Sequence, residues 1–115
     1  MVSGVLFFVV IQKQDDKNKF IGTWVLTTDN EYQITFYNDG RFVGAYAKQW
    51  GTWDIKDGKL VLNITDNTSS NYPNQEYTAI FDYSFRNNHQ ILTISVIAGN
   101  TFYGSMTFTK VNSTQ

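Results

Sequence analysis

Hydrophobic and polar side chains alternate from residue 20 onward with a period of two, which is typical of β-strands that have one buried face. Short polar segments interrupt this alternation. The clearest, Asn38-Asp39-Gly40 and Asp57-Gly58, predict tight hairpins because Asn, Asp and Gly tolerate the positive φ angles of such turns. The pattern predicts eight strands. Their inward-facing positions, taken at every second residue, are 20–26, 32–36, 42–46, 53–55, 60–64, 77–85, 92–96 and 102–108.

The order of these strands predicts the fold class. Eight short strands joined mostly by hairpins, without a helical period, indicate an all-β antiparallel up-and-down meander. Such a meander most simply curls into a closed eight-stranded barrel, because closure leaves no exposed strand edge. Glycines at the inward positions Gly22, Gly44 and Gly104 suit the bends that closure requires. We expect one barrel domain over residues 20–110, followed by a polar tail at 111–115.

The first 19 residues have a different character. An unbroken apolar run, Gly4–Ile11, precedes a polar, mixed-charge segment at 12–19. The run is too short to cross a bilayer core, for which a helix needs about 20 residues, and it lacks the flanking residues of a signal peptide. Two interpretations remain open. The run is the end of a transmembrane or export segment that begins upstream, with 12–19 as its linker, or it is an extra strand or short helix packed on the domain.

Composition argues against several classes of partner and chemistry. The chain has 115 residues and a net charge of -1, and its Lys and Arg residues are scattered, so we expect no nucleic-acid surface. It has no Cys and a single His, His89, in a predicted turn. The carboxylates lie in turns or at outward positions, which leaves no inward pair for acid–base catalysis. We therefore expect a non-enzymatic domain without a metal or cofactor, with membrane contact only through the N-terminal segment.

Several motifs occur in an order that resembles a known family. Gly22-Thr23-Trp24, preceded by Phe20, resembles the Gly-x-Trp signature that opens lipocalins. The motifs that follow are Ile34-Thr35-Phe36, Asp39-Gly40-Arg41-Phe42, Gly51-Thr52-Trp53-Asp54-Ile55 and Asp57-Gly58-Lys59-Leu60. Over residues 20–110 the chain resembles the small lipocalin-like, calycin-type domains of bacterial and archaeal surface or lipoprotein-type proteins. The resemblance implies a lipocalin-like barrel in an extracytoplasmic or membrane-anchored protein. The Arg that packs over the signature Trp in lipocalins is absent, and Lys110 is its nearest substitute.

Aromatic residues dominate the predicted interior, and two interpretations of them remain open. The rings can simply fill the barrel, since eight strands enclose only enough space for side chains or for one small molecule. The inward tyrosines favour a ligand, because a buried Tyr hydroxyl needs a partner and a mostly apolar pocket with a few polar groups is the usual small-molecule site. For a small apolar or amphipathic ligand in the barrel, the candidate residues are Trp24, Tyr46, Trp53, Tyr77 and Tyr83.

The alternative function is a filled barrel that acts as a surface protein-interaction or structural module. Its basis is a set of aromatic and aliphatic residues at outward positions, which would mark a protein contact if they formed one patch. These residues are Tyr37, Val43, Trp50, Val61, Ile80, Ile91, Ile97 and Tyr103.

Overall fold

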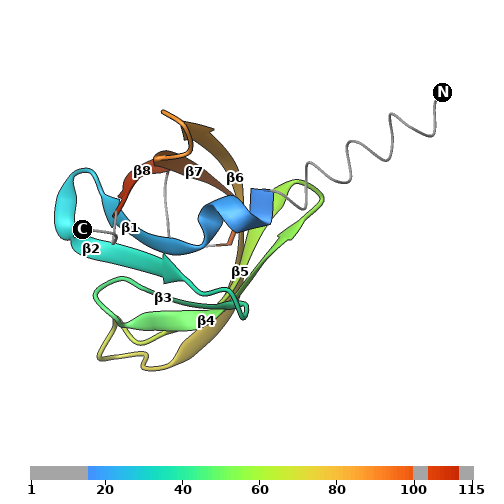
Figure 1. Cartoon of the computed structure of the whole chain (residues 1–115). Coiled ribbons are helices and arrows are strands. Elements are labelled where there is room, and N and C mark those ends of the chain that lie inside the picture. The colour runs from blue at the N-terminus through green and yellow to red at the C-terminus, as the bar shows by residue number, and fades with distance from the viewer. Residues whose placement is uncertain (1–15, 100–103, 112–115) are drawn as a thin grey trace.

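The computed structural model describes residues 16–99 and 104–111 (Figure 1). A helical turn at 16–20 precedes eight strands. The strands are β1 (Gly22–Leu26), β2 (Asp29–Phe36), β3 (Arg41–Gly44), β4 (Gln49–Lys56), β5 (Lys59–Asp66), β6 (Gln75–Arg86), β7 (Ile91–Ala98) and β8 (Ser105–Lys110). Each strand pairs antiparallel with the next, and β1 also pairs with β8, so the sheet closes into one barrel.

This architecture confirms the predicted fold class, an all-β closed barrel of eight antiparallel strands with up-and-down topology. It is compatible with a lipocalin-like fold. The closing register aligns Trp24 on β1 with Lys110 on β8. The Lys110 Nζ lies 5.3 Å from the centroid of the Trp24 ring. Lys110 therefore packs over the ring of Trp24.

The hydrophobic core occupies the barrel interior and follows the predicted alternation. On β5, Leu60, Leu62 and Ile64 are buried while the residues between them are more exposed. Burying a large apolar side chain contributes about 1.5–3 kcal/mol, so the interior accounts for much of the stability of a domain this small. The largest fully buried side chains are Trp24, Phe20, Phe36, Phe42, Phe81, Phe108, Leu60 and Leu92.

Phe20 corrects one boundary of the predicted strands. We expected Phe20 to open the first strand, but it ends the helical turn at 16–20, and β1 begins at Gly22. The chain changes direction at Gly22, whose φ of 129° lies in a region that side-chain-bearing residues rarely adopt. The side chain of Phe20 is fully buried all the same, because the helical turn folds back over the barrel. A period of two cannot distinguish this kind of burial from that of a strand residue.

The helical turn closes one end of the barrel, and in Figure 1 it lies across the ring of strands. The Tyr83 hydroxyl donates a hydrogen bond of 2.8 Å to the Asp16 carboxylate, and Lys17 Nζ lies 3.2 Å from the Asp54 carboxylate. The Phe20 ring lies between 4.9 and 5.8 Å, centroid to centroid, from the rings of Phe36, Trp53, Tyr83 and Phe85. We call this end, formed by the helical turn and these rings, the closed end.

Tyr46 is a second correction. We expected it to face inward on the third strand, but β3 ends at Gly44, and Tyr46 is 52% exposed. Ala45, Tyr46 and Ala47 have φ angles of 50°, 60° and 65°, which form a left-handed turn between β3 and β4. The strand alternation is lost at this turn, so the parity that β3 sets does not extend to Tyr46.

Two further predictions concern residues outside the described ranges. The apolar run at 4–11 and the first part of the polar segment lie outside them, so both interpretations of the N-terminus stay open. We expected the eighth strand to include Phe102, which also lies outside them, and β8 is described from Ser105. Within the described part of the chain, no helix has the length and hydrophobicity to span a membrane.

Candidate functional site

The five residues predicted to bind a ligand are divided between the two ends of the barrel. Trp24, Trp53 and Tyr83 lie at or beside the closed end, in ring contact with Phe20 or Phe85. Tyr46 and Tyr77 lie at the other end, where their hydroxyl groups bond to the carboxylates of Asp29 and Asp66. The structure therefore does not bring the five together around one pocket.

The polar groups of the three residues at the closed end are satisfied by the protein itself. The Trp24 indole N–H donates to the Phe20 carbonyl at 2.8 Å, and the Trp53 indole N–H donates to the Tyr37 carbonyl at 3.0 Å. Burial raises the pKa of Tyr83, and its hydrogen bond to Asp16 raises it further. These contacts are those of a packed core, in which the indole and phenol groups hold the helical turn and the hairpin between β2 and β3.

The lumen near the middle of the barrel is almost filled. An internal space of about 10 Å³ lies among side chains of the inner face. A space of this size holds about one water molecule. The residues that line it are Tyr32, Ile34, Gly44, Gln49, Leu62, Ile64, Ile94, Met106 and Phe108.

A much larger hollow opens at the end opposite the closed end. Its volume is about 490 Å³, and we call it the mouth. β4 begins at Gln49, which lines the mouth, and runs past Trp53, whose ring contacts Phe20, toward the closed end. The mouth shares Tyr32 and Gln49 with the internal space, so it leads toward the core. Its lining residues are Tyr32, Ala45, Tyr46, Lys48, Gln49, Asp66 and Thr68.

Two tyrosines form an aromatic wall of the mouth. The rings of Tyr32 and Tyr46 meet edge to face, with centroids 5.3 Å apart and planes at 79°. The Tyr46 hydroxyl donates a hydrogen bond to the Asp29 carboxylate, which holds the exposed ring in place and raises the pKa of Tyr46. Burial raises the pKa of Tyr32 to about 12, with further contributions from Tyr77, Tyr46 and Asp66. Both phenols are therefore neutral donors at neutral pH.

Asp66 is a buried carboxylate in the mouth, and its hydrogen-bonding capacity is fully used. One oxygen accepts from the Thr68 backbone N–H at 2.9 Å and the Thr68 hydroxyl at 2.6 Å. The other accepts from the Gln49 amide at 3.0 Å and the Tyr77 hydroxyl at 2.9 Å. Burial would raise the pKa of Asp66, but these hydrogen bonds outweigh it and hold the pKa below the ordinary value of 3.8. Asp66 therefore joins β4, β5 and β6 at the rim.

The substitution Asp66→Asn is expected to destabilise the protein by about 1–3 kcal/mol at neutral pH. The carboxylate of Asp66 accepts hydrogen bonds at both oxygens, and in the variant the amide N–H₂ would face some of the same donors. The pKa of Asp66 is lower in the folded protein than the ordinary aspartate value, so the ionised carboxylate stabilises the fold at pH values above that ordinary value. This stability is lost as the pH falls through the pKa of the folded state. The cost of the substitution should therefore shrink in acid. Urea unfolding of both proteins at neutral pH and at about pH 3 measures this difference. An equal cost at both pH values would contradict it.

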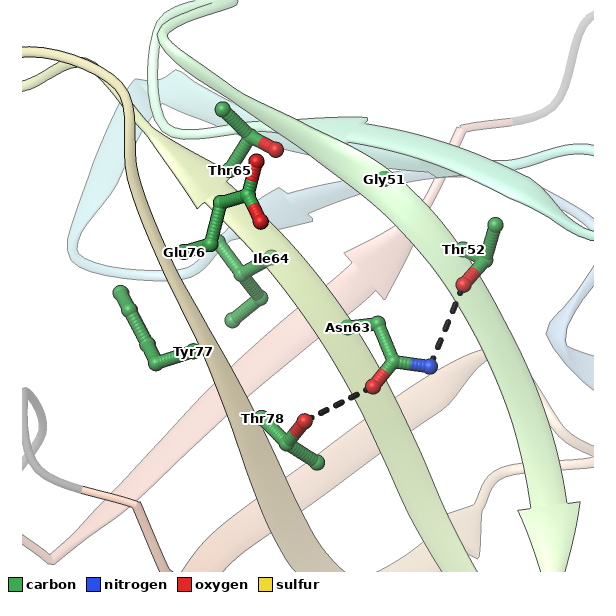
Figure 2. Close-up of a pocket in the computed structure, with 8 residues that line it drawn as sticks. All are labelled: Gly51, Thr52, Asn63, Ile64, Thr65, Glu76, Tyr77 and Thr78. Atoms are coloured by element: carbon green, nitrogen blue, oxygen red, sulfur yellow. Dashed lines mark hydrogen bonds between the residues drawn. The ribbon is translucent and has the colours of Figure 1, made fainter.

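A second hollow, of about 460 Å³, lies across β4, β5 and β6 (Figure 2). Its floor is a row of polar side chains, in which the amide of Asn63 on β5 forms hydrogen bonds to residues on β4 and β6. Asn63 Nδ2 donates to the Thr52 hydroxyl at 3.3 Å, and the Thr78 hydroxyl donates to Asn63 Oδ1 at 2.8 Å. Thr52, Asn63 and Thr78 are exposed, so this hollow lies on the outer surface of the barrel. Its polar side chains mainly bond to one another across the sheet.

The strand register divides the outward apolar residues of this region into separate groups. Val43 pairs with Trp50, and Val61 pairs with Ile80. The polar row of Thr52, Asn63 and Thr78 lies between these pairs. The outer surface of β4–β6 therefore does not form the single apolar patch that a large protein interface favours. Tyr103 lies outside the described residues.

Several residues of the mouth were missed by the sequence analysis. We expected every carboxylate to lie in a turn or at an outward position, but β5 continues to Asp66, whose side chain is buried and has the same inward parity as Ile64. A polar residue that continues the inward positions of an apolar strand is the signal that could have identified it. Gln49 carried no such signal, because the turn before it is irregular.

The described residues contain no group of three or more His, Cys, Asp or Glu side chains that could hold a metal ion. Comparison of the chain with family models, with curated proteins and with solved structures finds no match. The function of the domain is therefore inferred from the geometry of the mouth.

Proposed function

We propose that this domain is a non-enzymatic binding module that holds a small apolar or amphipathic ligand in the mouth, above the filled part of the barrel. The mouth itself carries this proposal. A hollow of about 490 Å³ is in the size range of small-molecule sites, whereas the internal space of about 10 Å³ leaves room for little more than a water molecule.

The chemistry of the lining supports a binding role. Tyr32 and Tyr46 offer ring surface, and Lys48 and Gln49 offer polar groups beside it, which is the usual composition of a small-molecule site. Asp66 accepts four hydrogen bonds, so it has little capacity to act as a general base. His89 is exposed in the turn between β6 and β7, at the opposite end from the mouth.

The assignment to small lipocalin-like domains is part of the same proposal. The closed up-and-down barrel and the packing of Lys110 on Trp24 support it. An extracytoplasmic location rests on the sequence resemblance alone.

A filled barrel that serves as a structural or protein-interaction module is the second candidate. The internal space of about 10 Å³ favours it, as does Trp50, which is 39% exposed beside Val43. The two candidates differ in one measurable respect, since only the first requires the mouth to bind small molecules.

Titration of the ¹⁵N-labelled protein with 2-naphthol, a neutral amphipathic probe, tests the proposal. We expect chemical-shift changes at the Gln49 side-chain amide and at the Ala45 backbone amide, both of which line the mouth. Tryptophan fluorescence is a poor reporter here, because Trp24 and Trp53 lie toward the closed end. The substitution Tyr46→Ala should weaken binding about 2- to 12-fold, the effect of losing one aromatic contact.

The matched control is Tyr37→Ala. It removes another exposed tyrosine side chain, but at the hairpin between β2 and β3, beside the closed end. This variant should bind the probe as the wild type does. Shift changes that are absent from the mouth, or an equal loss in the two variants, would favour the filled module instead.

A further inference from the structure

The mouth combines aromatic faces with carboxylates that lie at its edge. Tyr46 is 52% exposed, so part of its ring surface is accessible beside the edge-to-face contact with Tyr32. Tyrosine rings present negative electron density at their faces and attract cations within about 6 Å. A neutral apolar ligand makes no use of this property.

Carboxylates surround the same two rings. Asp66 lies within the mouth, and Asp29 accepts the hydrogen bond of the Tyr46 hydroxyl. Glu31 lies on the outer side of Tyr46, where the two residues line a neighbouring groove of about 240 Å³. The negative charge of Asp29 and Glu31 adds to the rise in the pKa of Tyr46, after its hydrogen bond to Asp29 and its burial. Tyr46 therefore lies in the negative potential of Asp29 and Glu31.

Among the described residues, Lys48 is the only cationic side chain that lines the mouth, and it opposes these carboxylates. It is exposed, in the turn between β3 and β4, and its backbone N–H bonds to the Ala45 carbonyl at 3.0 Å. A flexible ammonium group at the rim is well solvated and can turn away from a bound ligand. Asp66 and Lys48 balance each other among the residues that line the mouth, so the additional negative charge comes from Asp29 and Glu31 beside Tyr46 at its edge.

We propose, on the basis of the function proposed above, that the mouth selects small organic cations, such as a quaternary ammonium group, over neutral molecules of the same shape. The cation packs against the faces of Tyr46 and Tyr32 while Asp29, Glu31 and Asp66 supply the opposing charge. Asp66 acts at a distance, because its own oxygens are occupied by hydrogen bonds. The apolar part of the ligand lies toward Ala45 and the internal space.

Choline and 3,3-dimethyl-1-butanol test this selection, because they have nearly the same shape and differ in charge. In titrations followed at the Gln49 and Ala45 amides, we expect choline to bind at least about threefold more tightly, as one additional unit-charge interaction near a surface allows. The preference should shrink when the salt concentration rises from about 0.05 M to about 0.5 M, since the charges are partly exposed.

Three variants locate the effect. Glu31→Gln should weaken choline binding about twofold to threefold and leave the neutral alcohol unchanged, whereas Lys48→Gln should strengthen choline binding. Asp57→Asn is the matched control, because it removes one carboxylate at the hairpin between β4 and β5, at the closed end. It should change neither affinity.

The outcomes separate this inference from the function on which it rests. Equal binding of choline and the alcohol at the mouth would overturn the cation selection and leave the binding function in place. Equal effects of Glu31→Gln and Asp57→Asn would also overturn it, because they would assign the preference to net charge alone. Binding of neither compound, nor of 2-naphthol, would overturn both.

Discussion

Replacing Phe20 by alanine is expected to lower the free energy of unfolding by about 3–5 kcal/mol. The Phe20 side chain is fully buried and its ring contacts the rings of Trp53 and Tyr83, so its loss leaves a cavity beneath the helical turn. The loss also loosens the segment at 16–20, which keeps the bonds of Asp16 and Lys17 to barrel residues and the hydrogen bond from the Trp24 indole to the Phe20 carbonyl. The Lys17–Asp54 ion pair is partly exposed and contributes little by itself.

Urea unfolding followed by circular dichroism measures the effect of Phe20→Ala. Tyr72→Ala is the control, because Tyr72 is a 64% exposed aromatic residue of the loop between β5 and β6, and its removal should change stability by no more than about 0.5 kcal/mol. Phe20→Leu should fall between the two, since it retains most of the buried apolar volume. A loss below about 1 kcal/mol for Phe20→Ala would show that the helical turn does not pack on the barrel in solution.

The second large effect is expected at Gly51 on β4. A Cβ atom added there would lie 1.9 Å from the Asn63 carbonyl oxygen, which is a backbone atom and cannot rotate away. The φ of Gly51 is 153°, outside the range that side-chain-bearing residues favour. Gly51→Ala should therefore force β4 and β5 apart and cost about 2–5 kcal/mol, as the sum of overpacking and backbone strain.

Gly58→Ala is the matched control for this substitution. Gly58 also has a positive φ, of 73°, but an added Cβ would meet no atom of the described residues within 4 Å. Its cost should be limited to the backbone strain of about 1–2 kcal/mol. Thermal unfolding of the two variants compares them directly. Similar costs at the two positions would mean that β4 and β5 separate easily at Gly51, which would contradict the close approach.

The fold could be predicted because one rule governs most of the chain. On β5, burial of every second residue from Leu60 to Ile64 follows from a wall with core on one side and solvent on the other. The rule fails where burial has another geometrical origin. Phe20 reaches the core through a helical turn at the barrel end, and Tyr46 leaves it through a left-handed turn, and neither event changes the order of apolar and polar residues.

The candidate site could be predicted less well. The alternation of residues along a strand shows which face of the sheet a side chain is on, but not at which end of the barrel it lies. Tyr77 and Tyr83 share the inward face of β6 but are six residues apart, which corresponds to about 20 Å along an extended strand. A small ligand cannot contact both, so their spacing in the sequence is sufficient to divide the candidate residues into two groups. The mouth itself depends on the turn at Ala45–Ala47, which no local pattern indicates, and on the extension of β5 to Asp66, which only the shared inward parity of Ile64 and Asp66 could have indicated.

The position of the closed end also determines on which side of the barrel a tag or a surface can be attached. The helical turn at 16–20 enters there, and the chain returns to the same side at Val111, whose backbone N–H donates to the Thr23 carbonyl at 2.9 Å. A tag, a surface or a fusion partner that is joined directly next to residue 16 or residue 111 would therefore be attached on the face away from the mouth. Protein immobilised at such a point should present the mouth to the solution, which makes tethered formats suitable for testing the proposed binding of small molecules.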